Sequence, residues 1–153
     1  MTISLEPPYD ARDGAGMTGR IERAADQVDE ALAAAAAHPW VLPAGTRPAL
    51  LAVGAMGGSA IASDLAAACH ADVLPHPILT VRDYAWPACV SGATLALVCS
   101  YSGNTEESLA LYREAGARGV LRAALTTGGT LETWAVRDGV PCMGVPGGAP
   151  PRA

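Results

Sequence analysis

The sequence contains no lysine and no phenylalanine, and only 5% of its 153 residues are aromatic. Without lysine, a glycine-rich phosphate loop that ends in Gly-Lys-Ser or Gly-Lys-Thr is excluded. All ten basic residues are arginines, and the formal net charge of −5 gives no overall attraction for nucleic acid or acidic membranes. We therefore expect neither as a partner, although a local cradle of donors can still bind an anion. With so few aromatic residues, the core should be aliphatic and built from Ala, Val, Leu and Ile.

Motifs for metals, disulfides and targeting are also missing. The four cysteines form no C-x-x-C pair, and the three histidines stand at no metal-ligand spacing relative to them. Cys99 and Cys142 fall in apolar runs and are predicted to be inert core thiols. No apolar run approaches the roughly 20 residues of a membrane span, and the N-terminus lacks the basic and apolar regions of a signal peptide. We expect a cytoplasmic protein that contacts no membrane and holds no metal.

The residues that are present alternate between strand-like and helix-like patterns. Residues 1–17 carry prolines and glycines and are predicted to form an extended arm, whereas residues 19–37 place apolar side chains at helical spacing. From residue 49 onward, short apolar runs typical of buried parallel strands are separated by amphipathic stretches. The predicted strands are residues 49–53, 78–81, 94–100, 120–125 and 141–145, with helices at 60–70, 106–118 and 131–137. This alternation predicts an α/β fold with a five-stranded parallel sheet flanked by helices.

Three of the predicted strands lead into turns that are rich in glycine or hydroxyl residues. These turns are residues 57–59, 100–105 and 126–129. Ligands of parallel sheets bind beyond the carboxyl ends of the strands, at the point where the strand order reverses. We therefore expect the three turns to lie together and to form a ligand site.

The stretch from Ser100 to Glu107 is the best candidate for an anion site. Ser100, Ser102 and Thr105 bring three hydroxyls to the beginning of a predicted helix, where unpaired N–H groups and the helix dipole favour a phosphate. The alternative is an ordinary helix cap, with Thr105 as N-cap and the following glutamates placed against the dipole. The position beyond a strand's carboxyl end favours the phosphate.

The turn Gly57-Gly58-Ser59 is a second candidate. A dinucleotide fingerprint that starts at Gly54 fails, because Met56 stands where a glycine is needed and no acidic residue ends the following strand. What remains is a turn that lets the backbone approach a small ligand, with Ser59 as helix N-cap or ligand donor. A purely structural turn is the alternative.

Five segments in order resemble the N-terminal half of bifunctional phosphoglucose/phosphomannose isomerases, which belong to the sugar isomerase (SIS) domain superfamily. The segments are residues 57–59, 81–84, 100–107, 127–129 and 151–152. The resemblance covers roughly residues 50–153 and implies a SIS domain of flavodoxin-like architecture at residues 18–146. Residues 147–153 would then begin a linker to a second SIS domain.

The resemblance also implies a ligand and a reaction. The ligand would be a hexose 6-phosphate, and the reaction would convert glucose 6-phosphate or mannose 6-phosphate to fructose 6-phosphate through a cis-enediol, without a metal or other cofactor. In the family pattern, Arg152 corresponds to the arginine that stabilises the developing enediolate. The residues that correspond to phosphate-binding or sugar-binding positions are Gly57, Gly58, Ser59, Ser100, Ser102 and Thr105.

The sequence departs from the family in one respect. The family's proton-transferring glutamate and ring-opening histidine belong to the second SIS domain, and no residue of this chain matches them. We therefore expect a half-enzyme that is inactive alone and that pairs with a missing C-terminal SIS half or forms a homodimer. Two alternatives remain: a stand-alone SIS module that binds or senses phosphosugars without catalysis, and a structural remnant without a ligand.

Overall fold

The computed structural model describes residues 13–14, 16–37 and 41–148. The chain divides into two compact units, one of residues 38–147 and the other of residues 1–37 with 148–153. The second unit contains helices α1 (Met17–Glu22) and α2 (Ala24–Ala37), where the sequence predicts one helix over residues 19–37. The first helix begins earlier because the Asp13 carboxylate accepts the backbone N–H groups of Met17 and Thr18, at 2.6 and 2.7 Å. It ends at Arg23, which separates the two helices.

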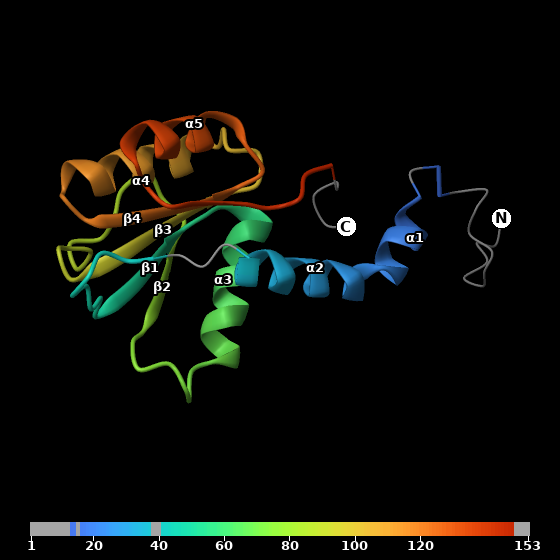
Figure 1. The fold of residues 1–153 in the computed structure, drawn as a ribbon, viewed down its shortest axis with the longest axis horizontal. Helices are drawn as coiled ribbons and strands as arrows, with labels where there is room; N and C mark the ends of the chain where they lie inside the picture. Colours follow the sequence, from blue (N-terminus) through green and yellow to red (C-terminus); the bar gives the residue numbers. More distant parts are fainter. Residues whose placement is uncertain (1–12, 15, 38–40, 149–153) are drawn as a thin grey trace. The chain divides into compact units, whose positions relative to one another are not determined.

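The larger unit is a five-stranded parallel sheet in the order β2-β1-β3-β4-β5 (Figure 1). The chain alternates strands and helices, and each strand pairs in parallel with its neighbours in that order. The elements are β1 (Leu50–Gly54), α3 (Gly57–Cys69), β2 (Ile78–Val81), β3 (Thr94–Ser100), α4 (Glu106–Ala117), β4 (Leu121–Thr126), α5 (Gly129–Asp138) and β5 (Cys142–Gly144). The predicted α/β fold is confirmed, and the strand order is that of flavodoxin-like proteins, with its reversal between β1 and β3.

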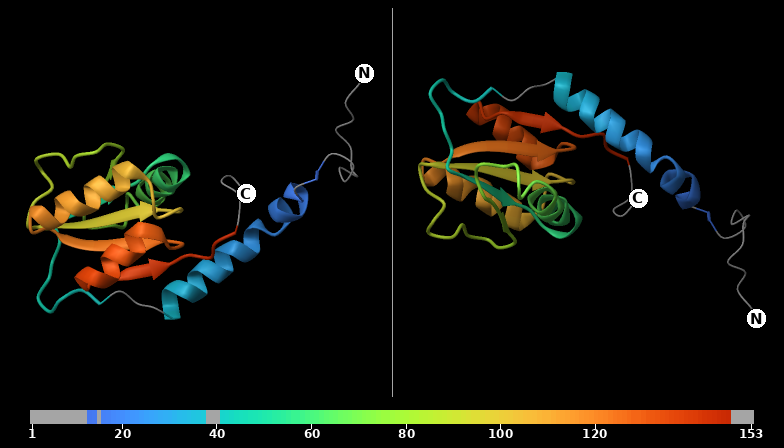
Figure 2. Two further views of the ribbon diagram at one scale, coloured as in Figure 1. Left: turned by 90° about the horizontal axis from the view of Figure 1, so that it is seen from above. Right: turned by 90° about the horizontal axis from the view of Figure 1, so that it is seen from below.

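Helices cover the two faces of this sheet unequally. In Figure 1, α4 and α5 lie on one face, and α3 lies on the other. Figure 2 shows the same elements from above and from below. Helix α3 contacts β1, β2 and β3, whereas α4 and α5 pack against β3, β4 and β5. The turns that join β1 to α3 and β3 to α4 therefore begin at neighbouring strands and lead to opposite faces.

The main core lies beneath α4 and α5, and its composition corrects one expectation. Two aromatic side chains, Trp86 and Tyr112, stand at its centre with 3% and 1% of their surfaces exposed, so the core is not purely aliphatic. The Trp86 indole donates from Nε1 to the backbone oxygen of Leu111 at 2.8 Å. It fits because Gly54 has no side chain: a Cβ there would lie 2.9 Å from the Trp86 ring. Arg118 holds the same segment by donating to the Trp86 backbone oxygen at 2.8 Å.

The core beneath α3 is smaller and aliphatic apart from Cys99. Its buried members are Val53, Ala55, Ala60 and Cys99. Burial raises the pKa of the Cys99 thiol to about 12, so the thiol stays protonated and unreactive, as the sequence predicts. The helices of the described residues are too short or too polar to cross a membrane.

Candidate functional site

The carboxyl ends of β1, β3 and β4 meet at one edge of the sheet. Gly54, the last residue of β1, pairs with Val98 of β3, and Ser100, the last residue of β3, pairs with Thr126 of β4. The three polar turns that follow these strands are therefore neighbours, as the sequence predicts. The turn after β3 lies in the middle and is hydrogen-bonded to the turn after β4 at several points.

Ser100 shapes the central turn from inside. Its side chain is 3% exposed, and its hydroxyl donates to the Thr105 Oγ1 at 3.0 Å while it accepts the N–H of Gly103 at 3.1 Å. Gly103 has a φ of 67°, which glycine adopts without the steric cost that a Cβ would bring. Both capacities of the Ser100 hydroxyl are thus used within the turn.

Thr105 is the N-cap residue of α4 in position but not in hydrogen bonding. Its backbone is extended, with φ −65° and ψ 123°, and its side chain makes no capping hydrogen bond to the helix. Instead its Oγ1 accepts the proton of Ser100, so its own hydroxyl proton is not used in that bond. The first-turn N–H groups of α4 are consequently not satisfied by the N-cap side chain. Such groups attract anions at helix N-termini.

Ser102 lies on the outside of the same turn. Its side chain is exposed, and its Oγ accepts the backbone N–H of Asn104 at 3.2 Å, which leaves its hydroxyl proton for another acceptor. Ser102 and Thr105 thus present hydroxyl donors beside the beginning of α4. We call this segment the β3–α4 turn (residues 100–105).

The turn after β4 supports the β3–α4 turn from the neighbouring strand. Thr127 donates to the Tyr101 backbone oxygen from its N–H at 3.2 Å and from its hydroxyl at 2.7 Å. The N–H of Leu131 donates to the Gly103 backbone oxygen at 2.9 Å. We call this segment the β4–α5 turn (residues 126–131). It fixes the backbone of the β3–α4 turn along its length.

The turn after β1 differs from the prediction at Ser59. Helix α3 begins at Gly57, three residues before the predicted start, and its N-cap is Met56. Ser59 is therefore the third residue of the helix and not its N-cap. Gly57 and Gly58 are exposed, and a Cβ at either would have no atom within 4 Å, so the backbone there faces open space. A ligand can approach this backbone closely.

Ser59 and Ser100 line one cavity of about 340 Å³ on the α3 face of the sheet. Tyr101 also lines it, and most of the remaining wall is apolar, from β1, β3 and β4. The structure therefore brings the turn after β1 and the β3–α4 turn to a shared opening. Of the predicted site residues, Ser59, Ser100, Ser102 and Thr105 lie on these adjoining turns, and Arg152 lies outside the described residues.

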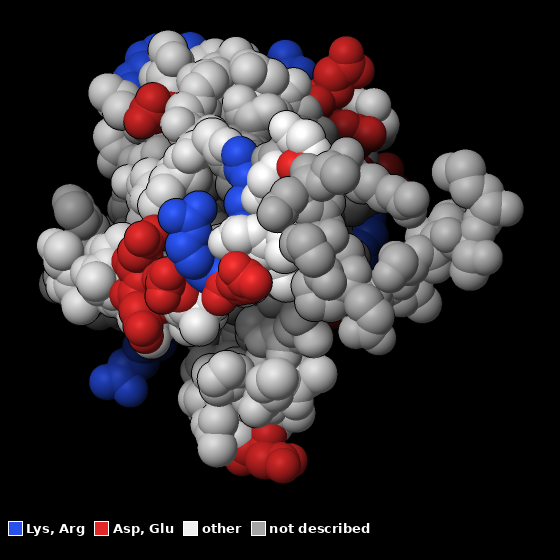
Figure 3. Space-filling view, turned by 90° about the vertical axis from the view of Figure 1, so that its right-hand side faces the viewer, with Lys and Arg blue, Asp and Glu red and all other residues white. Residues whose placement is uncertain are grey.

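The segment at residues 81–84 lies at the carboxyl end of β2. Arg82 forms an ion pair with Asp64 of α3, and the pKa of that carboxyl is lowered, first by a hydrogen bond from Thr80 and then by Arg82. Tyr84 lies beside the first turn of α4, where Glu107 and then burial raise the pKa of its phenol. On the face drawn in Figure 3, acidic and basic side chains of the described residues lie side by side.

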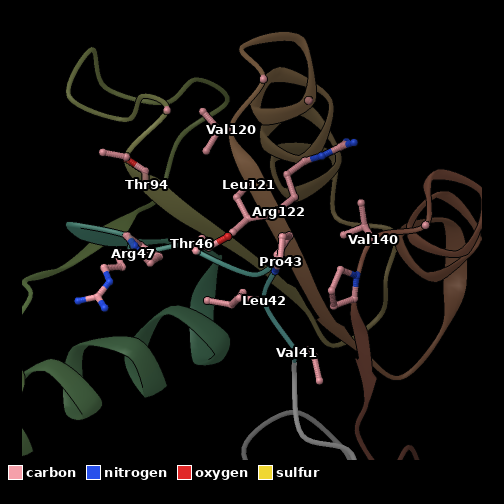
Figure 4. Close-up of a pocket in the computed structure, with 18 residues that line it drawn as sticks. Val41, Leu42, Pro43, Thr46, Arg47, Thr94, Val120, Leu121, Arg122 and Val140 are labelled. Carbon is pink, nitrogen blue, oxygen red and sulfur yellow. The ribbon is translucent and has the colours of Figure 1, made fainter.

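A larger hollow of about 760 Å³ lies at the opposite, amino-terminal ends of the strands (Figure 4). Its two arginines, Arg47 and Arg122, point in different directions. The Arg122 guanidinium lies 4.4 Å from the ring centre of Tyr112 and pairs with Asp138 at 3.6 Å. It is engaged with these two side chains. Within the described ranges, no group of three or more His, Cys, Asp or Glu side chains could hold a metal ion.

The curated proteins that match this chain share one description. Over 98 residues the chain is 44% identical to a bifunctional phosphoglucose/phosphomannose isomerase of Caldicellulosiruptor bescii. This match covers 64% of this chain and 29% of that protein. Over 103 residues it is 36% identical to the protein of the same description from Thermoplasma acidophilum. This match covers 67% of this chain and 31% of that protein. The resemblance predicted from the motifs is confirmed. The chain spans about 30% of the length of these relatives.

Solved structures confirm the fold. The tagatose-6-phosphate ketose/aldose isomerase of Escherichia coli matches with a TM-score of 0.54 and 20% identity, over 66% of this chain and 30% of that one. The Vibrio vulnificus NanR protein, solved in complex with ManNAc-6P, matches with a TM-score of 0.55 and 14% identity. This match covers 90% of this chain and 53% of that one. The chain therefore has the SIS fold of phosphosugar isomerases. No family model matches the chain.

Proposed function

We propose that this chain is the sugar-phosphate-binding part of a glucose-6-phosphate/mannose-6-phosphate isomerase and that its ligand is a hexose 6-phosphate. One observation carries the proposal. At the carboxyl end of β3, Ser102 and Thr105 present hydroxyl donors beside the first turn of α4, whose N–H groups receive no hydrogen bond from the N-cap side chain. The name shared by the curated relatives supports the choice of substrate. In this proposal residues 18–146 act as one SIS domain, and residues 147–153 lead toward a second.

The phosphate is bound by donors of the β3–α4 turn. The hydroxyls of Ser102 and Thr105 and the first-turn N–H groups of α4 donate to its oxygens, and the positive end of the helix dipole faces its charge. Charge-assisted hydrogen bonds of this kind contribute about 1.5–3 kcal/mol each. Ser59 donates from the neighbouring helix, and the open backbone at Gly57 and Gly58 makes room for the sugar. Ser100 holds the turn in shape.

The reaction is an aldose–ketose isomerisation. A proton leaves C2 of the open-chain aldose and the C1 carbonyl oxygen takes up a proton, so that the electron pair forms the C1–C2 double bond of a cis-enediol. A proton is then returned at C1, and the O2 hydroxyl loses its proton as the C2 carbonyl of the ketose forms. The family resemblance assigns charge stabilisation of the enediolate to Arg152. It assigns the glutamate base and the ring-opening histidine to a second SIS domain, so we propose that turnover needs that domain as a partner. No metal or other cofactor takes part in this scheme.

Calorimetry with fructose 6-phosphate tests the binding site. The double variant Ser102→Ala plus Thr105→Ala should lose about 3–6 kcal/mol of binding free energy, which corresponds to an affinity at least about a hundredfold lower. Ser91→Ala is the matched control, because its exposed hydroxyl lies at the amino-terminal end of β3. Equal affinities for the double variant and the control would show that the cradle lies elsewhere.

The second candidate function is a module that binds phosphosugars without converting them. The complex of the NanR protein with ManNAc-6P favours it, because that match covers 90% of this chain. The purified chain should be assayed for isomerase activity alone and mixed with the C-terminal SIS half of a curated relative. Activity in the mixture supports the isomerase, and binding without activity in either case supports the module. A homodimer, measured by light scattering, is compatible with both.

A further inference from the structure

We propose that Asn104 is a positioning residue of the phosphate cradle, which orients Ser102 by connecting the β3–α4 turn to the β4–α5 turn. This inference rests on the proposed function, since it assigns a role in holding the phosphate. It concerns a residue that the sequence marks only as able to form a tight turn. The observations that carry it are the partners of the Asn104 side chain and the close contact of the two turns.

Both ends of the Asn104 side chain are used. Its Nδ2 donates to the backbone oxygen of Ser102 at 3.1 Å, within its own turn. Its Oδ1 accepts two hydrogen bonds from Thr130 in the other turn, from the N–H at 3.1 Å and from the hydroxyl at 2.9 Å. A backbone carbonyl can only accept and a backbone N–H can only donate, so these partners fix which end of the amide is oxygen. The side chain therefore has one orientation, which bridges the two turns.

The backbone of Asn104 adds a direct link to the ligand-binding hydroxyl. Its N–H donates to Ser102 Oγ at 3.2 Å, so that the Ser102 hydroxyl proton is directed to another acceptor. Asn104 thus contacts Ser102 twice, once at the carbonyl oxygen and once at the hydroxyl. A change at Asn104 moves the donor that the proposed function places on the phosphate.

The two turns approach each other so closely that only glycine fits at the contact. A Cβ at Gly129 would lie 2.6 Å from the Ser102 backbone oxygen and 3.0 Å from Asn104 Nδ2. From the other side, a Cβ at Gly103 would lie 1.8 Å from the Gly128 backbone oxygen. Asn104 lies at the centre of this contact. The β4–α5 turn, which has no predicted ligand-binding side chain of its own, acts on the phosphate through it.

The first test is affinity for fructose 6-phosphate, measured by calorimetry on the full chain. Asn104→Ala should weaken binding about tenfold or more, because it removes the side-chain bonds to the Ser102 backbone oxygen and to Thr130. Thr130→Val should weaken binding by a smaller factor, since only the hydroxyl bond to Asn104 Oδ1 is lost, and Thr130→Ser should restore it. Urea unfolding of each variant, followed in parallel, identifies any variant that fails to fold.

The second readout separates positioning from a general loss of stability. Asn104 is the only asparagine and Gln27 the only glutamine, so the chain has two side-chain amide signals in a ¹H–¹⁵N spectrum. The signal that disappears in Asn104→Ala belongs to Asn104. In the wild-type chain this signal should shift when fructose 6-phosphate is added, and in Thr130→Val its starting position should change.

The outcomes are distinct. Binding by the wild-type chain with unchanged affinity in folded Asn104→Ala and Thr130→Val overturns the inference and leaves the proposed function standing. An Asn104 signal that does not respond to a bound ligand overturns it as well. No binding by the wild-type chain overturns the proposed function and this inference together. Weaker binding in Thr130→Val with recovery in Thr130→Ser supports the positioning role, because a loss of bulk alone predicts the opposite order.

Discussion

Gly103→Ala should destabilise the protein through the contact between the β3–α4 and β4–α5 turns. Gly103 has a φ of 67°, and a Cβ there would lie 1.8 Å from the Gly128 backbone oxygen. The left-handed conformation costs a residue with a side chain about 1–2 kcal/mol. Because the atom that the Cβ meets belongs to the backbone, one turn must move, and strain of this kind costs about 1–3 kcal/mol more. The expected loss of unfolding free energy is therefore about 2–5 kcal/mol.

Gly119→Ala is the matched control for this substitution. Gly119 follows α4 with a φ of 66°, nearly the same backbone angle, but a Cβ there would have no atom within 4 Å. It should therefore cost only the conformational part, about 1–2 kcal/mol. The difference between the two variants measures the contact of the turns alone.

Urea unfolding, followed by tryptophan fluorescence, measures both variants. Trp86 is 3% exposed and should report the loss of the main core. Gly103→Ala should shift the unfolding midpoint further than Gly119→Ala by the equivalent of about 1–3 kcal/mol. Equal shifts in the two variants would refute the close approach of the turns, and with it the structural basis of the cradle.

Two further predictions concern the core and the acid stability. Trp86→Phe should lower the unfolding free energy by about 1–3 kcal/mol, because it leaves a gap and removes the hydrogen bond to Leu111, and the same urea assay measures this. Asp138→Asn should flatten the loss of stability on acidification. Hydrogen bonds from Arg137 and then Tyr112 hold the pKa of this carboxyl below its ordinary value, so its contribution is present above the unfolded-state pKa and lost as the pH falls through the lower folded-state pKa. Urea midpoints across the acidic range should show a smaller slope in the variant, and an unchanged slope would contradict this account.

The sheet could be predicted from the sequence because its strands are short, mainly apolar runs, and all but β2 end at a glycine or hydroxyl residue. The run from Thr94 to Ser100 forms β3 with the predicted bounds, and Ile78 to Val81 forms β2. Gly119 could also be placed as the residue that ends α4, since a left-handed glycine after a helix is common. These features depend on local pattern. Because the strands are parallel, the polar turns that follow them all lie at the same edge of the sheet.

The start of α3 and the position of Trp86 could not be predicted in the same way. Gly57 and Gly58 are weak helix formers, and local propensity places the start after them, at Ala60. Trp86 lies in a connection of polar and proline residues that has no strand or helix period. Its burial depends on a space that Gly54 leaves on a distant strand. Such fits between remote residues leave no periodic signal in the sequence.

Sequence also could not divide the hydroxyls of the β3–α4 turn between structure and binding. Ser100 and Ser102 are the same residue type two positions apart, yet Ser100 is buried and bonded inside the turn, while Ser102 is exposed. The end of β3 at Ser100 explains this difference, because Ser102 lies in the turn, where the strand pattern that would place residues i and i+2 on one face no longer holds. The family resemblance implies one role for both residues, but the structure gives them different surroundings.

The choice between a helix cap and an anion site depends on the Thr105 hydroxyl. In an ordinary cap this hydroxyl would accept an N–H of the first turn of α4, which typically stabilises a helix by about 1 kcal/mol. Here it accepts the Ser100 proton instead, and the helix forgoes that stabilisation. Because Ser100 donates to Thr105, the Thr105 hydroxyl can donate its own proton to a third group. It lies beside the first-turn N–H groups of α4, which the N-cap side chain does not bind. An oxyanion at this point would accept from both kinds of donor at once.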